Sequence, residues 1–135
     1  MLRKVLVVDD DEGVRALLTS AFGSEGYTVF PVAAAEEALE LITRENIQVA
    51  FVDLQLPAMS GLELCRKIRE KRAVDILFAL TGHASVFDLV ECREAGFDDY
   101  FTKPFDPLSL VKSARDAFAK LDRWKDLLKS YPKRQ

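Results

Sequence analysis

Acidic side chains gather at the ends of two apolar segments of this 135-residue chain. The first segment, VLVV, runs directly into Asp9 and Asp10, and the segment VAFV ends at Asp53. When the two segments form adjacent parallel strands, about 4.8 Å apart, the three carboxylates share one small volume. Like charges this close repel one another unless a cation lies between them, and an oxygen-lined pocket open to water suits Mg²⁺, or Mn²⁺ in its place. The sequence therefore predicts a divalent-cation site.

Two further polar residues stand at the ends of apolar segments. Thr81 ends the segment Ile76–Thr81, and Lys103 follows the segment Asp99–Thr102 and precedes Pro104. A threonine at the end of a strand is common and by itself indicates nothing. A lysine in a loop is often only solvated, but its position between a strand and a proline favours a role for Lys103 in the same site.

Not every acid in this region points to a site. We interpret Asp11 and Glu12 as the start of the first helix, where acidic side chains stabilise the positive end of the helix dipole. Asp53 has no such explanation, because the next helix is predicted to start at Ser60, seven residues later. A carboxylate at the end of a buried strand and far from a helix start favours a functional role.

The pattern of apolar residues predicts how these side chains are held in place. Amphipathic helices alternate with short apolar strands, and the first helix carries its apolar residues at helical spacing. Strands that are apolar throughout indicate a parallel sheet buried on both faces, with helices covering each side. This is a doubly wound (βα)₅ sandwich, in which sites form beyond the carboxyl ends of the strands. The predicted strands are Lys4–Asp9, Thr28–Val32, Val49–Asp53, Ile76–Thr81 and Asp99–Thr102, and the apolar face of the first helix is Val14, Leu17, Leu18, Ala21 and Phe22.

Composition limits the class of protein. The chain is 49% hydrophobic and 30% charged, with a net charge of −3, which fits one folded domain. It contains no apolar run close to the roughly 20 residues of a membrane span, so we expect a cytoplasmic protein without membrane contact. Cys65 and Cys92 have neither disulfide nor metal-site spacing, and we interpret them as small buried hydrophobes.

The carboxyl-terminal residues extend the last helix. We divide the chain into a domain at residues 1–120 and an extension at 121–135, where the helix is expected to run to about Ser130. Apolar residues at seven-residue spacing continue into this extension, so it could pair with a second copy, fold back onto its own domain, or begin a linker. Residues 119–135 hold six basic and two acidic side chains, a density that favours a solvated helix face over direct binding of DNA.

Four motifs in this order identify a family resemblance. The chain resembles the receiver domains of bacterial two-component response regulators over roughly residues 3–118. The motifs are VLVVDDD (5–11), VDLQLPAMSGLEL (52–64), ALTGHA (79–84) and DDYFTKPF (98–105). The resemblance implies a flavodoxin-like sandwich with strand order 2-1-3-4-5.

The resemblance also implies roles at the predicted site. Asp53 corresponds to the phosphoacceptor, and Asp9 and Asp10 to the acids that bind Mg²⁺, with Asp10 favoured as the direct ligand. The backbone carbonyl of Gln55 corresponds to a further ligand. Lys103 corresponds to the phosphate-contacting lysine, and its bond to the following proline is cis in the family.

Switching is implied at two other positions. Thr81 corresponds to the hydroxyl that responds to the phosphoryl group, and Tyr100 to the aromatic side chain that turns with it. Gln55 and His83 occupy variable positions that tune the lifetime of the acylphosphate. The responding face is then Val86–Ala95, Tyr100 and Leu108–Phe118.

The function implied is a signalling switch activated by phosphorylation. A histidine kinase or a histidine phosphotransfer protein would donate the phosphoryl group to Asp53, and the responding face would bind a downstream partner or a second copy. Such a domain is not an enzyme beyond assisting its own phosphorylation and dephosphorylation.

Three other interpretations fit less well. A magnesium-dependent phosphohydrolase with an aspartyl nucleophile would need an acid two residues after Asp53, where this chain has Gln55. A nucleotide- or flavin-binding domain would need a glycine-rich turn after the first strand, where four acids would instead repel phosphates. A degenerate receiver used only as a binding module would have lost one of the site residues, and all are present.

Overall fold

A five-stranded parallel sheet forms the centre of the protein. The computed structural model describes residues 2–82 and 85–131. The strands run in the order β2-β1-β3-β4-β5, which confirms the predicted doubly wound, flavodoxin-like topology. They pair in parallel throughout, so their carboxyl ends meet at one edge of the sheet. Their bounds are β1 (Lys4–Val8), β2 (Thr28–Val32), β3 (Val49–Asp53), β4 (Ile76–Thr81) and β5 (Asp99–Thr102).

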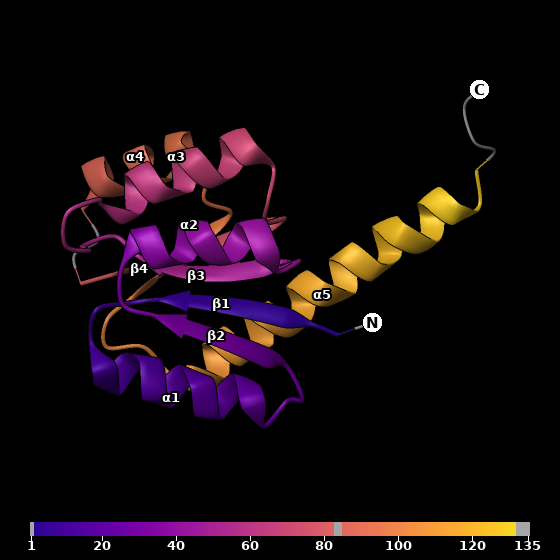
Figure 1. Ribbon diagram of the computed structural model, residues 1–135, viewed down its shortest axis with the longest axis horizontal. Coiled ribbons are helices and arrows are strands. Elements are labelled where there is room, and N and C mark those ends of the chain that lie inside the picture. The colour runs from indigo at the N-terminus through magenta and orange to yellow at the C-terminus, as the bar shows by residue number, and fades with distance from the viewer. Residues whose placement is uncertain (1, 83–84, 132–135) are drawn as a thin grey trace.

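Helices cover both faces of the sheet, as Figure 1 shows. On one face lie α1 (Glu12–Gly23) and α5 (Pro107–Lys129). On the other lie α2 (Ala35–Arg44), α3 (Gly61–Lys71) and α4 (Val86–Ala95). Each layer has its own apolar core, because successive residues of β1, β3 and β4 point to opposite faces. The central strands are therefore buried on both sides, as their apolar sequences predict.

Side-chain caps fix the helix starts, and those at Ser60 and Asp11 agree with the sequence prediction. Ser60 accepts a hydrogen bond from the amide of Glu63 at the start of α3, and Asp106 accepts one from Leu108 at the start of α5. The carboxylate of Asp11 accepts the amides at the start of α1, which agrees with its interpretation as a helix start. These caps satisfy donors that would otherwise have no partner and fix where each helix begins.

Two details differ from the sequence prediction. Strand β1 ends at Val8, so Asp9 lies just beyond it. Leu17 was expected in the core, but its side chain is 46% exposed. Helix α1 instead buries Leu18 and Phe22, four residues apart, against the sheet. Leu17 lies about 100° around the helix from Leu18 and falls outside this narrow apolar stripe.

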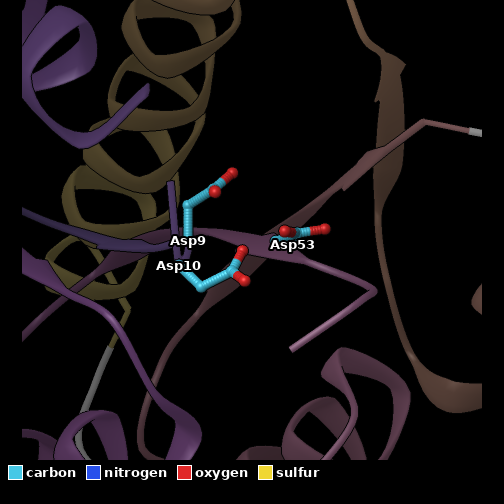
Figure 2. Close-up of side chains that lie close together, drawn as sticks. All are labelled: Asp9, Asp10 and Asp53. Atoms are coloured by element: carbon cyan, nitrogen blue, oxygen red, sulfur yellow. The ribbon is translucent and has the colours of Figure 1, made fainter. Parts of the chain in front are cut away.

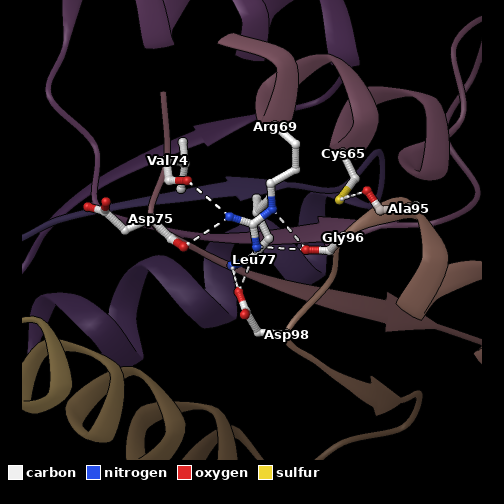
Figure 3. Close-up of polar contacts among 8 residues, drawn as sticks. All are labelled: Cys65, Arg69, Val74, Asp75, Leu77, Ala95, Gly96 and Asp98. Atoms are coloured by element: carbon white, nitrogen blue, oxygen red, sulfur yellow. Dashed lines mark hydrogen bonds and ion pairs between the residues drawn. The ribbon is translucent and has the colours of Figure 1, made fainter. Parts of the chain in front are cut away.

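Arg69, on α3, connects the ends of several helices and strands on the face of the sheet that α2, α3 and α4 cover, as Figure 3 shows. Its guanidinium donates to the Gly96 carbonyl from Nε at 2.9 Å and from Nη2 at 2.6 Å, and it pairs with Asp98 at 2.8 Å. The same Asp98 oxygen accepts the Leu77 amide at 2.8 Å. The carboxyl ends of α3 and α4 and the starts of β4 and β5 are thereby held together. In the same region the buried thiol of Cys65 donates to the Ala95 carbonyl at 3.4 Å, and burial raises its pKa to about 11.

Helix α5 continues beyond the sheet and projects away from the domain in Figure 1. Its first half buries residues such as Leu110 and Phe118, whereas Trp124 is 56% exposed and Leu128 is 67% exposed. The predicted extension is confirmed, and the alternative in which it folds back onto its own domain is wrong for the described residues. Within that part of the chain, no helix is long and apolar enough to cross a membrane.

Candidate functional site

Three carboxylates meet at the edge where the strands end. Asp9 and Asp10 follow β1, and Asp53 is the last residue of β3, which pairs with β1. Each offers an oxygen that lies within 4.8 Å of the other two, and Figure 2 shows the side chains extending into the same space. Parallel pairing of the two strands produces this convergence, as the sequence predicts.

Lys103 brings a positive charge against two of these carboxylates. Its ammonium lies 2.8 Å from Asp9 Oδ2 and 3.4 Å from Asp53 Oδ2. Burial alone would lower the pKa of Lys103, but pairing with Asp9 and the charge of Asp53 outweigh it and leave that pKa above its ordinary value. The lysine is therefore held as a cation between two almost fully buried carboxylates.

The surroundings of Asp53 disfavour its charged form. Burial raises its pKa above the ordinary value of 3.8, and the neighbouring charge of Asp9 adds to the rise. Opposing this, the amide of Gln55 donates to Asp53 Oδ1 at 3.0 Å, and Lys103 approaches the other oxygen. One oxygen of Asp53 is thus fixed by the backbone, while the other faces the lysine.

The donor set suits a divalent cation. Asp9 Oδ2 is buried, and Lys103, at 2.8 Å, is its one polar contact in the part of the chain that the structure describes. Asp10 is exposed to solvent, and among the described ion pairs Lys103 contacts two of the three carboxylates, Asp9 and Asp53. A surplus of negative charge on oxygen ligands, with one side open to water, is what Mg²⁺ requires.

The other predicted residues surround this cluster. Thr81 is buried at the end of β4 and pairs with Thr102, and its carbonyl accepts the amide of Lys103 at 2.7 Å. The Lys103–Pro104 bond is cis, as the resemblance implies. Tyr100 lies on the edge strand β5 and is 41% exposed. His83 falls outside the described residues.

The loop that follows Asp53 is packed tightly against the end of β3. The Gly61 amide donates to the Leu54 carbonyl at 3.0 Å, and a Cβ at Gly61 would lie 2.2 Å from the Asp53 carbonyl oxygen. No side chain fits at this distance, so a glycine is required where α3 begins beside the end of β3. The start of α3 is therefore packed directly against the backbone of Asp53.

Arg15 contacts the site, although the sequence reasoning did not select it. Its Nη1 donates to the carbonyl oxygen of Asp9 at 2.9 Å. The available signal was its place on α1, one helical turn after Asp11, which turns the side chain back toward the strand end.

Comparison with known proteins agrees with this geometry. A family model described as the response regulator receiver domain matches residues 5–115. The regulatory protein VanR of Enterococcus faecium is 41% identical over 125 residues, which cover 93% of this chain and 52% of VanR. The chain thus spans about half the length of this curated relative.

Solved structures have the same fold. A CheY-like response regulator receiver domain protein from Methanospirillum hungatei aligns with a TM-score of 0.86 at 32% identity, covering 91% of this chain and 98% of that one. The beryllofluoride-activated DrrB receiver domain aligns with a TM-score of 0.81 at 31% identity, covering 88% and 99%. With the family model matching most of its length and these folds superimposing on it, the chain belongs to the response regulator receiver domain family.

Proposed function

We propose that the chain is a signalling switch whose Asp53 accepts a phosphoryl group in a Mg²⁺-dependent reaction. The observation that carries this proposal is the set of contacts at Asp53. The carboxylate ends a buried strand, has one oxygen fixed by a backbone amide, and lies beside a lysine and two further acids. A histidine kinase or a histidine phosphotransfer protein is the donor class that the family membership favours.

The chemistry requires little beyond position and charge. An oxygen of Asp53 attacks the phosphorus in line, the new O–P bond forms, and the bond to the leaving group breaks with its electron pair. The phosphoryl oxygens carry the developing negative charge, and the Lys103 ammonium at 3.4 Å from Asp53 is placed to neutralise it. The Gln55 amide fixes the orientation of the attacking carboxylate.

The residues that would hold the metal are Asp10, Asp53 and the carbonyl of Gln55, with Asp9 acting through water. A bound magnesium ion would neutralise charge on the transferring phosphoryl group. Asp10 suits a direct ligand because it is exposed, whereas the carboxylate of Asp9 is engaged by Lys103 and by the amide of Asp11.

Phosphorylation would change the face formed by α4, β5 and α5. The Thr81 hydroxyl can bind a phosphate oxygen that the bare carboxylate lacks, so the segment after β4 would move toward Asp53. That movement would allow the ring of Tyr100, now 41% exposed, to turn inward. Gln55 and His83 would tune how long the acylphosphate survives. The cytoplasmic location of the protein stays a prediction.

A direct test is phosphorylation by a small phosphodonor. We expect the chain to gain one phosphoryl group, seen by intact mass, when it is incubated with phosphoramidate and Mg²⁺. Chelation of the metal should suppress the gain, because the three carboxylates repel an anionic donor when no cation neutralises them. A chain that gains no phosphoryl group under these conditions, while a receiver domain of known activity does, would contradict the proposal.

The downstream partner or second copy would bind the exposed apolar residues of this face and of the extension. We treat residues 1–120 as the receiver unit and 121–135 as its extension. Tyr100, Leu108, Trp124 and Leu128 are exposed there, with Leu108 at 74%. Their burial would favour association by about 25 cal/mol per Å² of apolar area.

We therefore predict that a beryllofluoride mimic of the phosphoryl group changes self-association. Coupling between two sites is typically about 1–3 kcal/mol, which corresponds to roughly 5- to 150-fold in the association constant. Sedimentation with and without the mimic measures it. Replacing Trp124 and Leu128 with serine should remove the change, whereas Leu17→Ser, at an exposed leucine on α1, should not. The same monomer in all samples would refute this prediction.

A further inference from the structure

We propose that Arg15 is a positioning residue for the acid pair. Its guanidinium holds the carbonyl of Asp9 and thereby sets the direction in which the Asp10 carboxylate reaches a divalent cation. This inference rests on the proposed function, because it assigns a role at the metal site described there.

The contacts of Asp9 show how this strand end is held. Its amide donates to the Val32 carbonyl of β2 at 3.1 Å, and its Oδ1 accepts the amide of Asp11 at 2.9 Å. Its carbonyl oxygen, which belongs to the peptide group linking Asp9 to Asp10, accepts from Arg15 at 2.9 Å. Arg15 is thus the side chain that fixes the plane of this peptide group.

Asp10 depends on that peptide plane. Its side chain is exposed, and no hydrogen bond or ion pair of its carboxylate is found in residues 2–82 and 85–131. The direction of the carboxylate is therefore set by its own backbone. A rotation of the Asp9–Asp10 peptide would turn the Asp10 side chain away from Asp53, whose oxygen it must approach to share a metal.

Arg15 is well placed to act as such an anchor. Its backbone amide donates to the Asp11 carbonyl at 3.1 Å, so the residue belongs to the first full turn of α1. The start of that helix is fixed by the Asp11 side chain, and the arginine side chain is half-buried. The guanidinium thus connects a rigid helix start to the end of β1.

The charge of Arg15 and its hydrogen bond to Asp9 would have opposite effects on Mg²⁺ affinity. None of the described carboxylates lies within ion-pair distance of its guanidinium, which instead donates to a carbonyl. A cation beside a metal site repels Mg²⁺ by simple electrostatics, so loss of the charge alone would tighten metal binding. Loss of the hydrogen bond would weaken it, because groups that orient metal ligands typically change affinity by about 10- to 100-fold. The sign of the change distinguishes the two.

The test measures metal binding directly, without a phosphodonor. Mg²⁺ is titrated into the full chain while backbone amide shifts are followed by NMR. We expect Arg15→Met to bind Mg²⁺ about 10-fold more weakly than the wild type. Arg15→Lys, which keeps the charge but lacks the planar fork, should also bind more weakly. Arg66→Met, at an exposed arginine on α3, should bind like the wild type.

A second readout is the exchange of the Asp11 amide in metal-free protein. This amide donates to Asp9 Oδ1, so a loosened strand end should make it exchange faster in both Arg15 variants but not in Arg66→Met. Overall stability is checked by urea unfolding of each variant, so that a folding defect is recognised and Arg15→Lys then carries the comparison.

The outcomes separate this inference from the function on which it rests. If the wild type binds Mg²⁺ and Asp10→Asn binds it weakly, but both Arg15 variants bind as tightly as the wild type or more tightly, the positioning role is wrong and the metal site stands. If the wild type binds no divalent cation, or Asp10→Asn binds like the wild type, the proposed metal site fails and the role of Arg15 fails with it.

Discussion

Replacing Lys103 with methionine is expected to slow phosphorylation from a small phosphodonor by about 10²-fold or more, the usual cost of removing a pre-placed group that stabilises developing charge. The Lys103 ammonium lies 3.4 Å from Asp53 and 2.8 Å from Asp9. Without it, two almost fully buried carboxylates face each other and repel both one another and the incoming phosphoryl oxygens. Methionine retains much of the length and apolar stem of lysine, so packing changes little.

The rate is measured by intact mass over time, at a Mg²⁺ concentration that saturates each variant. Lys112→Met, at an exposed lysine on α5, is the matched control and should react like the wild type. A Lys103→Met rate within about threefold of the wild type would mean that Lys103 contributes little to charge stabilisation in the transfer.

Replacing Asp53 with asparagine is expected to raise the free energy of unfolding at neutral pH in metal-free buffer. Burial and the charge of Asp9 raise the pKa of Asp53 above 3.8, so the charged form costs stability in the folded state. Asparagine removes that charge and can still accept the Gln55 amide at the same position. Lys103 keeps its closer partner, Asp9.

The pH dependence has a definite sign. Because the folded state binds the Asp53 proton more tightly than the unfolded state does, the contribution of Asp53 to stability falls as pH rises from 3.8 through the raised pKa. The advantage of Asp53→Asn should therefore be largest above the raised pKa and vanish below 3.8. Urea unfolding across this range tests it, with Asp126→Asn, on the exposed extension, as the control. An advantage that grows as pH falls would contradict the assignment of a raised pKa.

Much of the fold could be predicted because its signals are local. The strands β2 to β5 coincide with the predicted segments, and Ser60 caps the helix that it was expected to start. The same rule that places parallel strand ends at one edge brought Asp9, Asp10 and Asp53 together. Leu17 was assigned wrongly because helical spacing alone does not define the width of the face that the sheet covers.

The sequence does not indicate which ion pairs and hydrogen bonds the side chains of the site form. Lys103 could have paired with any of the carboxylates, and only the packed structure places it closer to Asp9 than to Asp53. Arg15 was missed because an arginine on an amphipathic helix usually faces solvent, and its bond to a carbonyl depends on the angle between α1 and β1. Such choices depend on tertiary contacts rather than on residue pattern.

The central claim is that Asp53 carries the phosphoryl group. It is tested most directly by treating the phosphorylated chain with borohydride, which reduces the acylphosphate, and by mapping the reduced residue in peptides. We expect the reduced residue to be Asp53, and we expect no reduction in Asp53→Asn. Reduction at Asp9 or Asp10 in the wild type, or an equally labile phosphoryl group in Asp53→Asn, would contradict the account.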